Sequence, residues 1–148
     1  MQGRLINIYW RILIPGLAGI IILELLKTTK LIAGINFQGN NYISLGLVIL
    51  AALFSIAIPV LYRSIFISGI RNNINISQIK FIRFETRLII ISLVSPYLVI
   101  AASVFIISEF HYTIIILCAL YSCYYYYPSK KRIKSEKKIF RILENQSK

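Results

Sequence analysis

The chain has 148 residues, 57% of them hydrophobic, and its 17 Lys and Arg against five acidic residues give a formal net charge of +12. Soluble domains of this length interrupt their apolar residues with charge every few positions, whereas here the charges cluster and long apolar stretches remain between them. A bilayer core of about 30 Å needs about 20 apolar residues per spanning helix. Four such stretches leave no room for a separate soluble domain, so the pattern predicts an all-α, polytopic membrane protein.

Four transmembrane helices are expected, at about residues 9–33, 42–68, 86–109 and 111–127. Tyr9 and Trp10 are placed as interfacial anchors at the start of the first. Its far end stays open, because the apolar run that stops at Leu26 resumes after Lys-Thr-Thr-Lys. Ser77 is a good N-cap for a basic helical segment that continues into the third span. Residues 109–112 (EFHY) are expected to form a tight external turn before the fourth.

The tail, residues 128–148, follows the transmembrane domain of residues 1–127 and carries eight of the 17 positive charges. Its apolar residues fall on one side of a helical wheel and leave Lys and Arg on the other: Ile133, Ile139, Phe140, Ile142 and Leu143. This pattern predicts an amphipathic helix that lies at the cytoplasmic interface.

The distribution of charge predicts the orientation of the spans. The N-terminus, the basic loop 63–87 and the tail hold fifteen of the 17 positive charges, and the opposite loops hold only Lys27 and Lys30. Because Lys and Arg are retained on the cytoplasmic side, we expect an even number of spans with both termini in the cytoplasm. The expected location is the cytoplasmic (inner) membrane of a bacterium.

Glu24 and Lys27 form the candidate functional pair of the first span. If the helix continues to residue 33, Glu24 lies near the middle of the membrane, where a carboxylate by default marks a proton, ion or substrate site. If the helix ends near Leu26, the two residues are an i,i+3 ion pair at the external interface. Both interpretations remain open from the sequence.

Three prolines are expected to kink the helices, and nine cations are candidate contacts for lipid or partner. Pro15, Pro59 and Pro96 each free a backbone carbonyl that a neighbouring helix or water must satisfy, although proline also simply shapes packing in membrane helices. The expected partners of the cations are anionic lipid head groups or an acidic protein. These cations are Arg63, Arg71, Lys80, Arg83, Arg87, Lys130, Lys131, Arg132 and Lys134.

Catalysis is not indicated, and no cofactor or metal site is expected. The chain has one His and no Asp, and it lacks a phosphate loop, a nucleophile elbow and any Glu/His metal spacing. Nucleic acid is not an expected partner, because the basic segments lack stacking aromatics on a sheet or a recognisable motif.

Residues 19–27 (GIIILELLK) place a carboxylate in the first of four short helices, and in this the chain superficially resembles the small multidrug resistance exporters. It departs from that family in the basic loop 63–87, in the cationic tail and in Lys27 beside the acid. The four-span layout with a basic central loop is also similar to that of the small assembly protein encoded with bacterial ATP synthases, in layout only. No family is assigned on these grounds.

Three functions follow as hypotheses. The leading one is a non-enzymatic accessory, assembly or interaction subunit of an inner-membrane complex, because the chain offers packing surfaces and charge without a reactive constellation. An alternative is a small homo-oligomeric transporter or pore, ion- or proton-coupled, built around Glu24. The third is a membrane-acting toxin or defence pore.

Overall fold

The structure is a computed structural model that describes residues 2–29, 41–70, 78–105 and 107–139, and all regular elements in these ranges are helical. The predicted all-α fold class is therefore confirmed. Three helical stretches are long and apolar enough to cross a membrane: Gly3–Thr28, Tyr42–Gly69 and Ile79–Val104. They identify the chain as a multi-pass membrane protein.

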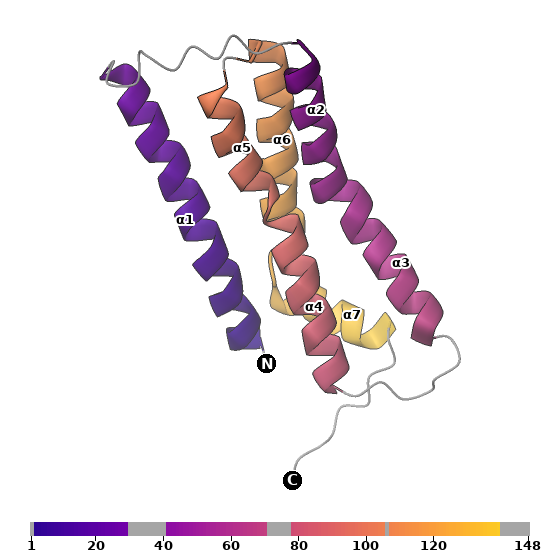
Figure 1. Cartoon of the computed structure of the whole chain (residues 1–148). Helices are drawn as coiled ribbons and strands as arrows, with labels where there is room; N and C mark the ends of the chain where they lie inside the picture. The colour runs from indigo at the N-terminus through magenta and orange to yellow at the C-terminus, as the bar shows by residue number, and fades with distance from the viewer. Residues whose placement is uncertain (1, 30–40, 71–77, 106, 140–148) are drawn as a thin grey trace.

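The helices form one elongated bundle with a short helix laid across one end (Figure 1). In chain order they are α1 (Gln2–Thr28), α2 (Asn41–Ala52), the π-helix η1 (Leu53–Ala57), α3 (Ile58–Ile70), α4 (Gln78–Ser92), α5 (Ser95–Val104), α6 (Glu109–Tyr125) and α7 (Lys130–Ile139). α4 and α5 form a central column, with α1 packed on one side of it and the α2–η1–α3 helix on the other. α6 packs against α5 and α2.

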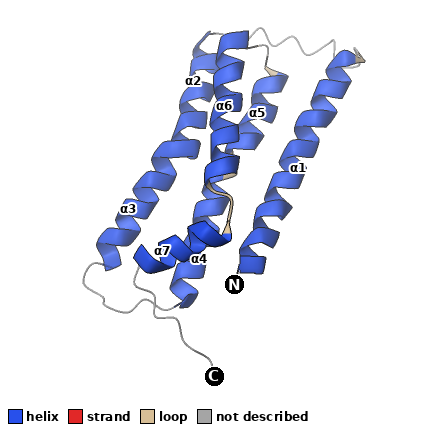
Figure 2. Cartoon of the chain, turned by 180° about the vertical axis from the view of Figure 1, so that it is seen from behind, coloured by secondary structure: helices blue, strands red, loops and turns tan. Residues whose placement is uncertain are grey.

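The positive residues gather at one end of this bundle. The start of α1, the end of α3, the start of α4 and the whole of α7 lie together there, as the view from behind also shows (Figure 2). We call it the basic end, and it carries Arg4, Arg63, Arg83, Arg87 and Arg132. The end of α1 and the start of α6 lie at the opposite end, with Glu24, Lys27 and Glu109.

Two hydrophobic clusters hold the bundle together. The one nearer the basic end is built from large side chains, among them Leu5, Phe81, Phe84 and Ile133. The other contains small residues from three helices, Ala51, Ala102 and Ala119, together with Val99 and Ile115. Small side chains let helix backbones approach closely where lipid supplies no hydrophobic driving force.

Two of the three prolines coincide with irregular backbone. Pro59 stands two residues after the end of η1 at Ala57. The N–H of Ile58, between them, bonds the carbonyl of Leu53, and Pro59 itself cannot donate the regular helical bond. Pro96 sits in the first turn of α5, after a two-residue turn at Leu93 and Val94 that separates α5 from α4. Pro15 lies inside α1, which runs as one helix from Gln2 to Thr28.

Several predicted boundaries differ from the observed ones. Residues 109–112 do not form a turn: α6 begins at Glu109, the chain is extended at Phe105, and Ser108 is the N-cap residue. Glu109 fits the first turn because a carboxylate is favourable beside the free N–H groups of a helix start. α1 begins at Gln2 rather than residue 9, and the expected extension beyond Thr29, the capping Ser77 and the tail beyond Ile139 lie outside the described residues.

The basic segment 63–87 is largely helical, as expected for the part that follows Ser77. α3 continues to Ile70 and α4 begins at Gln78, so the basic residues on either side of 71–77 stand on helices. α3, α4 and the start of α1 thus extend the bundle beyond its apolar middle, and α7 crosses this extension (Figure 1).

Candidate functional site

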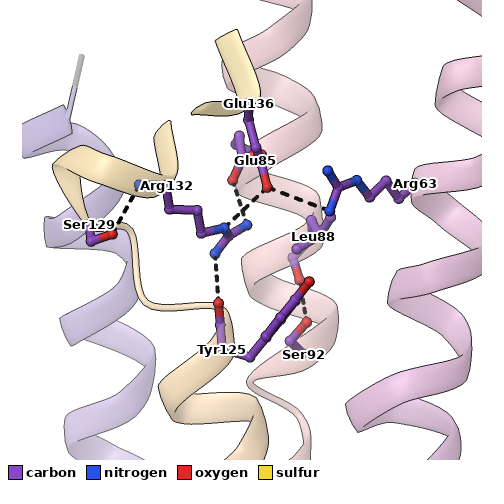
Figure 3. A network of polar contacts seen from close by, with 8 residues as sticks. All are labelled: Arg63, Glu85, Leu88, Ser92, Tyr125, Ser129, Arg132 and Glu136. Carbon is purple, nitrogen blue, oxygen red and sulfur yellow. Dashed lines mark hydrogen bonds and ion pairs between the residues drawn. The ribbon is translucent and has the colours of Figure 1, made fainter. Parts of the chain in front are cut away.

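The basic end contains a cluster of four charged side chains that joins three helices (Figure 3). Arg132 of α7 is its centre. Its Nη2 donates to Oε2 of Glu85 in α4 at 3.1 Å, and its Nε donates to Oε1 of Glu136, one turn further along α7, at 3.2 Å. Arg63 of α3 completes the cluster, with Nη1 4.0 Å from the same Glu136 oxygen.

Arg132 is also held by its own neighbourhood. Its Nη1 donates to the carbonyl of Tyr125 at 3.4 Å, and its guanidinium lies 5.4 Å from the centre of the Tyr126 ring. The backbone N–H of Arg132 donates to the Ser129 hydroxyl at 3.2 Å, which caps the start of α7. The fork of guanidinium donors is thereby fixed in direction, which favours recognition of planar carboxylates.

The two carboxylates of the cluster are buried, and Arg63 at its edge is 31% exposed. The Glu85 side chain is 1% exposed and that of Glu136 is 8%, while Arg132 is 16% exposed. Two carboxylates face two guanidinium groups, so the charges balance. Oxygens Oε1 of Glu85 and Oε2 of Glu136 are buried and accept no hydrogen bond from the described residues. Breaking a buried pair of this kind is costly because it leaves an uncompensated charge.

The local sequence explains why Glu85 points inward. Phe81, Phe84 and Leu88 are buried on the apolar face of α4, and Glu85 falls on that face by its helical spacing. Ile133 of α7 packs into the same cluster and is itself buried. Burial of Ile133 and pairing of Arg132 therefore fix α7 against the bundle together.

The sequence analysis missed Glu85 and Glu136 as site residues. The signal was present in α4, where Glu85 directly follows the core residue Phe84 and stands three residues before the core residue Leu88. An ionisable residue on the buried face of an amphipathic helix requires a partner of opposite charge. Arg63 and Arg132, expected as contacts for lipid or partner, instead pair with carboxylates of their own chain.

The other candidate cations of the basic end are exposed. Arg71 lies outside the described residues. The rest point away from the core: Lys80, Arg83, Arg87, Lys130, Lys131 and Lys134.

Glu24 and Lys27 are brought together at the opposite end. Lys27 Nζ lies 3.4 Å from Glu24 Oε1; the Lys27 side chain is 43% exposed and the Glu24 side chain is 51% exposed. The Tyr112 hydroxyl of α6 donates to the same Glu24 oxygen at 3.2 Å and lies 2.9 Å from the Ser103 hydroxyl of α5. Tyr112 was not foreseen as a member of this group.

A small cavity of about 200 Å³ adjoins this polar group, lined by Lys27, Ser103, Glu109 and Tyr112 among others. Glu24 stands one turn before the end of α1 at Thr28. The group therefore lies near the end of the bundle rather than at its middle. Within the part of the chain that the structure describes, no cluster of three His, Cys, Asp or Glu side chains is placed to hold a metal ion.

Comparisons with protein-family models, with curated proteins and with solved structures found no match for this chain.

Proposed function

We propose that the chain crosses a bacterial inner membrane four times, with both termini in the cytoplasm. α6 would be the fourth span, since it runs from the end of the bundle that holds Glu24 toward the basic end, and the connection that follows it leads to α7 there. Its 17 residues extend about 25 Å, and the interfacial tyrosines that follow bring it near the thickness of the bilayer core. The gathering of Lys and Arg at one end of the bundle supports the inward orientation of that end.

On this placement the chain is a non-enzymatic interaction or assembly subunit of a membrane complex. The observation that carries the proposal is the fixed position of α7. Arg132 and Ile133 anchor one side of this helix to the bundle, and Lys130, Lys131 and Lys134 remain exposed on it. A positively charged helix held across the cytoplasmic end by Arg132 and Ile133 is a surface suited to an acidic partner, because complementary charge steers association and selects partners.

The test is purification of the tagged full-length chain from native membranes in mild detergent. We expect a membrane protein to co-purify at a fixed ratio, and we expect Lys131→Gln/Lys134→Gln to lower that ratio. Arg83→Gln/Arg87→Gln is the matched control: it removes the same charge from exposed positions of α4. A chain that elutes alone, or equal loss in both variants, would contradict the proposal.

The polar group at Glu24 favours a second candidate, a small ion- or proton-coupled transporter. Tyr112 links Glu24 of α1 to Ser103 of α5, so hydrogen-bonding groups of three helices meet beside a cavity. Chains of carboxylate and hydroxyl groups are typical of proton pathways in membranes. The pairing of Glu24 with Lys27, half exposed and one turn from the helix end, supports the interaction subunit instead.

Proton flux into liposomes containing the purified chain separates the two candidates. If the transporter is correct, Glu24→Gln abolishes the flux and Glu109→Gln, which alters a carboxylate lining the same cavity, leaves it intact. Absence of flux from the unaltered chain would remove the second candidate.

A further inference from the structure

An open groove of about 500 Å³ lies between the first turns of α1 and α4 at the basic end. Its lining has a simple helical origin. On α4 the lining residues Ile79, Arg83 and Arg87 recur at every fourth position, and Ile82 and Thr86 stand beside them. On α1 the lining residues are Arg4 and Ile8, which are one helical turn apart. The groove is therefore lined by three isoleucines and three arginines.

The three arginines of this groove have no counter-charge within the described residues. Arg4, Arg83 and Arg87 are exposed and form no ion pair there. The described carboxylates are committed elsewhere: Glu85 and Glu136 to the buried cluster, and Glu24 and Glu109 at the opposite end. None of the described carboxylates neutralises the groove, which leaves its three arginines open to an anionic ligand.

The surroundings of the groove match an amphiphile. Along α4 the same face continues from Arg87 to Ile90, a side chain 44% exposed, toward the apolar middle of the bundle. A ligand with an anionic head and an apolar chain would contact both the guanidinium groups and this apolar surface. A soluble anion would contact the guanidinium groups alone.

We propose that this groove binds the phosphate group of an anionic phospholipid, with an acyl chain lying along the exposed apolar face of α4 that continues from the groove to Ile90. Guanidinium groups hold phosphate oxygens in paired hydrogen bonds, and basic residues near the membrane surface attract anionic lipid. The site requires the basic end to lie at the bilayer surface and does not depend on a partner complex.

Trp10, the only tryptophan of the chain, stands two residues from Ile8 and so faces another side of α1. Trp10→Phe/Ile90→Trp moves the tryptophan to the exposed position of α4 beside the groove, where it reports on this site, and this background is used for every variant below. The full chain is placed in nanodiscs of phosphatidylcholine that contain a small fraction of lipid with brominated acyl chains, which quench tryptophan on contact. The expected result is stronger quenching by brominated phosphatidylglycerol than by brominated phosphatidylcholine at the same fraction. The preference should fall by about 25-fold in Arg83→Gln/Arg87→Gln, since each of the two basic residues contributes about fivefold.

Three controls make the outcome decisive. Arg4→Gln, which changes only an exposed residue of α1, should weaken the preference without touching α4. Lys131→Gln/Lys134→Gln carries the same loss of charge on α7 and should keep the preference. Glycerol phosphate in solution should not relieve the quenching. Equal quenching by the two lipids, equal loss in the α7 variant, or displacement by glycerol phosphate would each overturn the proposal, the last assigning the groove to a soluble phosphate.

Discussion

Nη2 of Arg132 lies 3.1 Å from Oε2 of Glu85, across 47 residues of sequence, and this contact fastens the last described helix to the core of the bundle. The pair is almost fully buried and is continued by Glu136 and Arg63. Because α7 carries the exposed lysines of the basic end, its position decides which surface the chain presents there.

Loss of the Arg132 guanidinium should therefore be costly. We expect Arg132→Gln to lower the free energy of unfolding by about 3 kcal/mol, because Glu85 is left charged and buried without its partner. The measurement is the midpoint of unfolding by sodium dodecyl sulfate in mixed micelles. Lys131→Gln alters the neighbouring residue, which is exposed, and should change the free energy of unfolding by less than about 0.5 kcal/mol.

The same experiment distinguishes a lost charge partner from lost packing. Adding Glu85→Gln to Arg132→Gln removes the uncompensated carboxylate, so part of the stability should return. If the double variant is less stable than Arg132→Gln by the full cost of Glu85→Gln alone, the two side chains are not coupled and the proposed role of the pair is wrong.

The contact of α1 with α5 depends on the small size of Gly16. A Cβ atom at Gly16 would lie 3.5 Å from Cβ of Pro96 and 3.6 Å from the Tyr97 ring, so alanine fits and a longer side chain does not. We expect Gly16→Ala to be tolerated and Gly16→Leu to cost about 1–3 kcal/mol through overpacking. Gly46→Leu is the control, since no atom lies within 4 Å of its added Cβ; equal effects of the two leucine variants would argue against this contact.

The hydroxyl of Tyr112 connects α6 to both α1 and α5. Tyr112→Phe removes the hydrogen bond to Glu24 and leaves the buried Ser103 hydroxyl without that partner, so we expect a loss of about 1 kcal/mol. Tyr121→Phe, at an exposed ring on the same helix, should be close to neutral. In the Ser103→Ala background the effect of Tyr112→Phe should shrink; an unchanged effect would show that the two hydroxyls do not interact.

The all-helical, membrane-spanning character of the chain could be predicted because long apolar runs and clustered charge depend only on local composition. The break before Pro96 and the irregular turn before Pro59 followed from the missing proline N–H. The start of α6 was placed wrongly, because Glu109 and His111 were interpreted as loop residues when their polarity suits the first turn of a helix.

The pairing of charges could not be predicted from composition. Arg132 was expected to face lipid or a partner, and only the fold shows that Glu85, 47 positions earlier, lies within its reach. Such long-range pairs depend on how α7 is laid across the bundle, which no local pattern encodes. The inward direction of Glu85 was the one detectable signal, through its place among Phe81, Phe84 and Leu88.

The proposed arrangement places the basic end in the cytoplasm and has α6 cross the membrane. Single cysteines at Ser108 and at Ser135, both exposed, can be tested in a Cys118→Ala/Cys123→Ala background with a membrane-impermeant maleimide on intact cells. We predict that Ser108→Cys is labelled from outside and that Ser135→Cys is labelled only after the membrane is permeabilised. Labelling of Ser135→Cys on intact cells, or the same accessibility at both positions, would contradict the four-span, inward-facing arrangement.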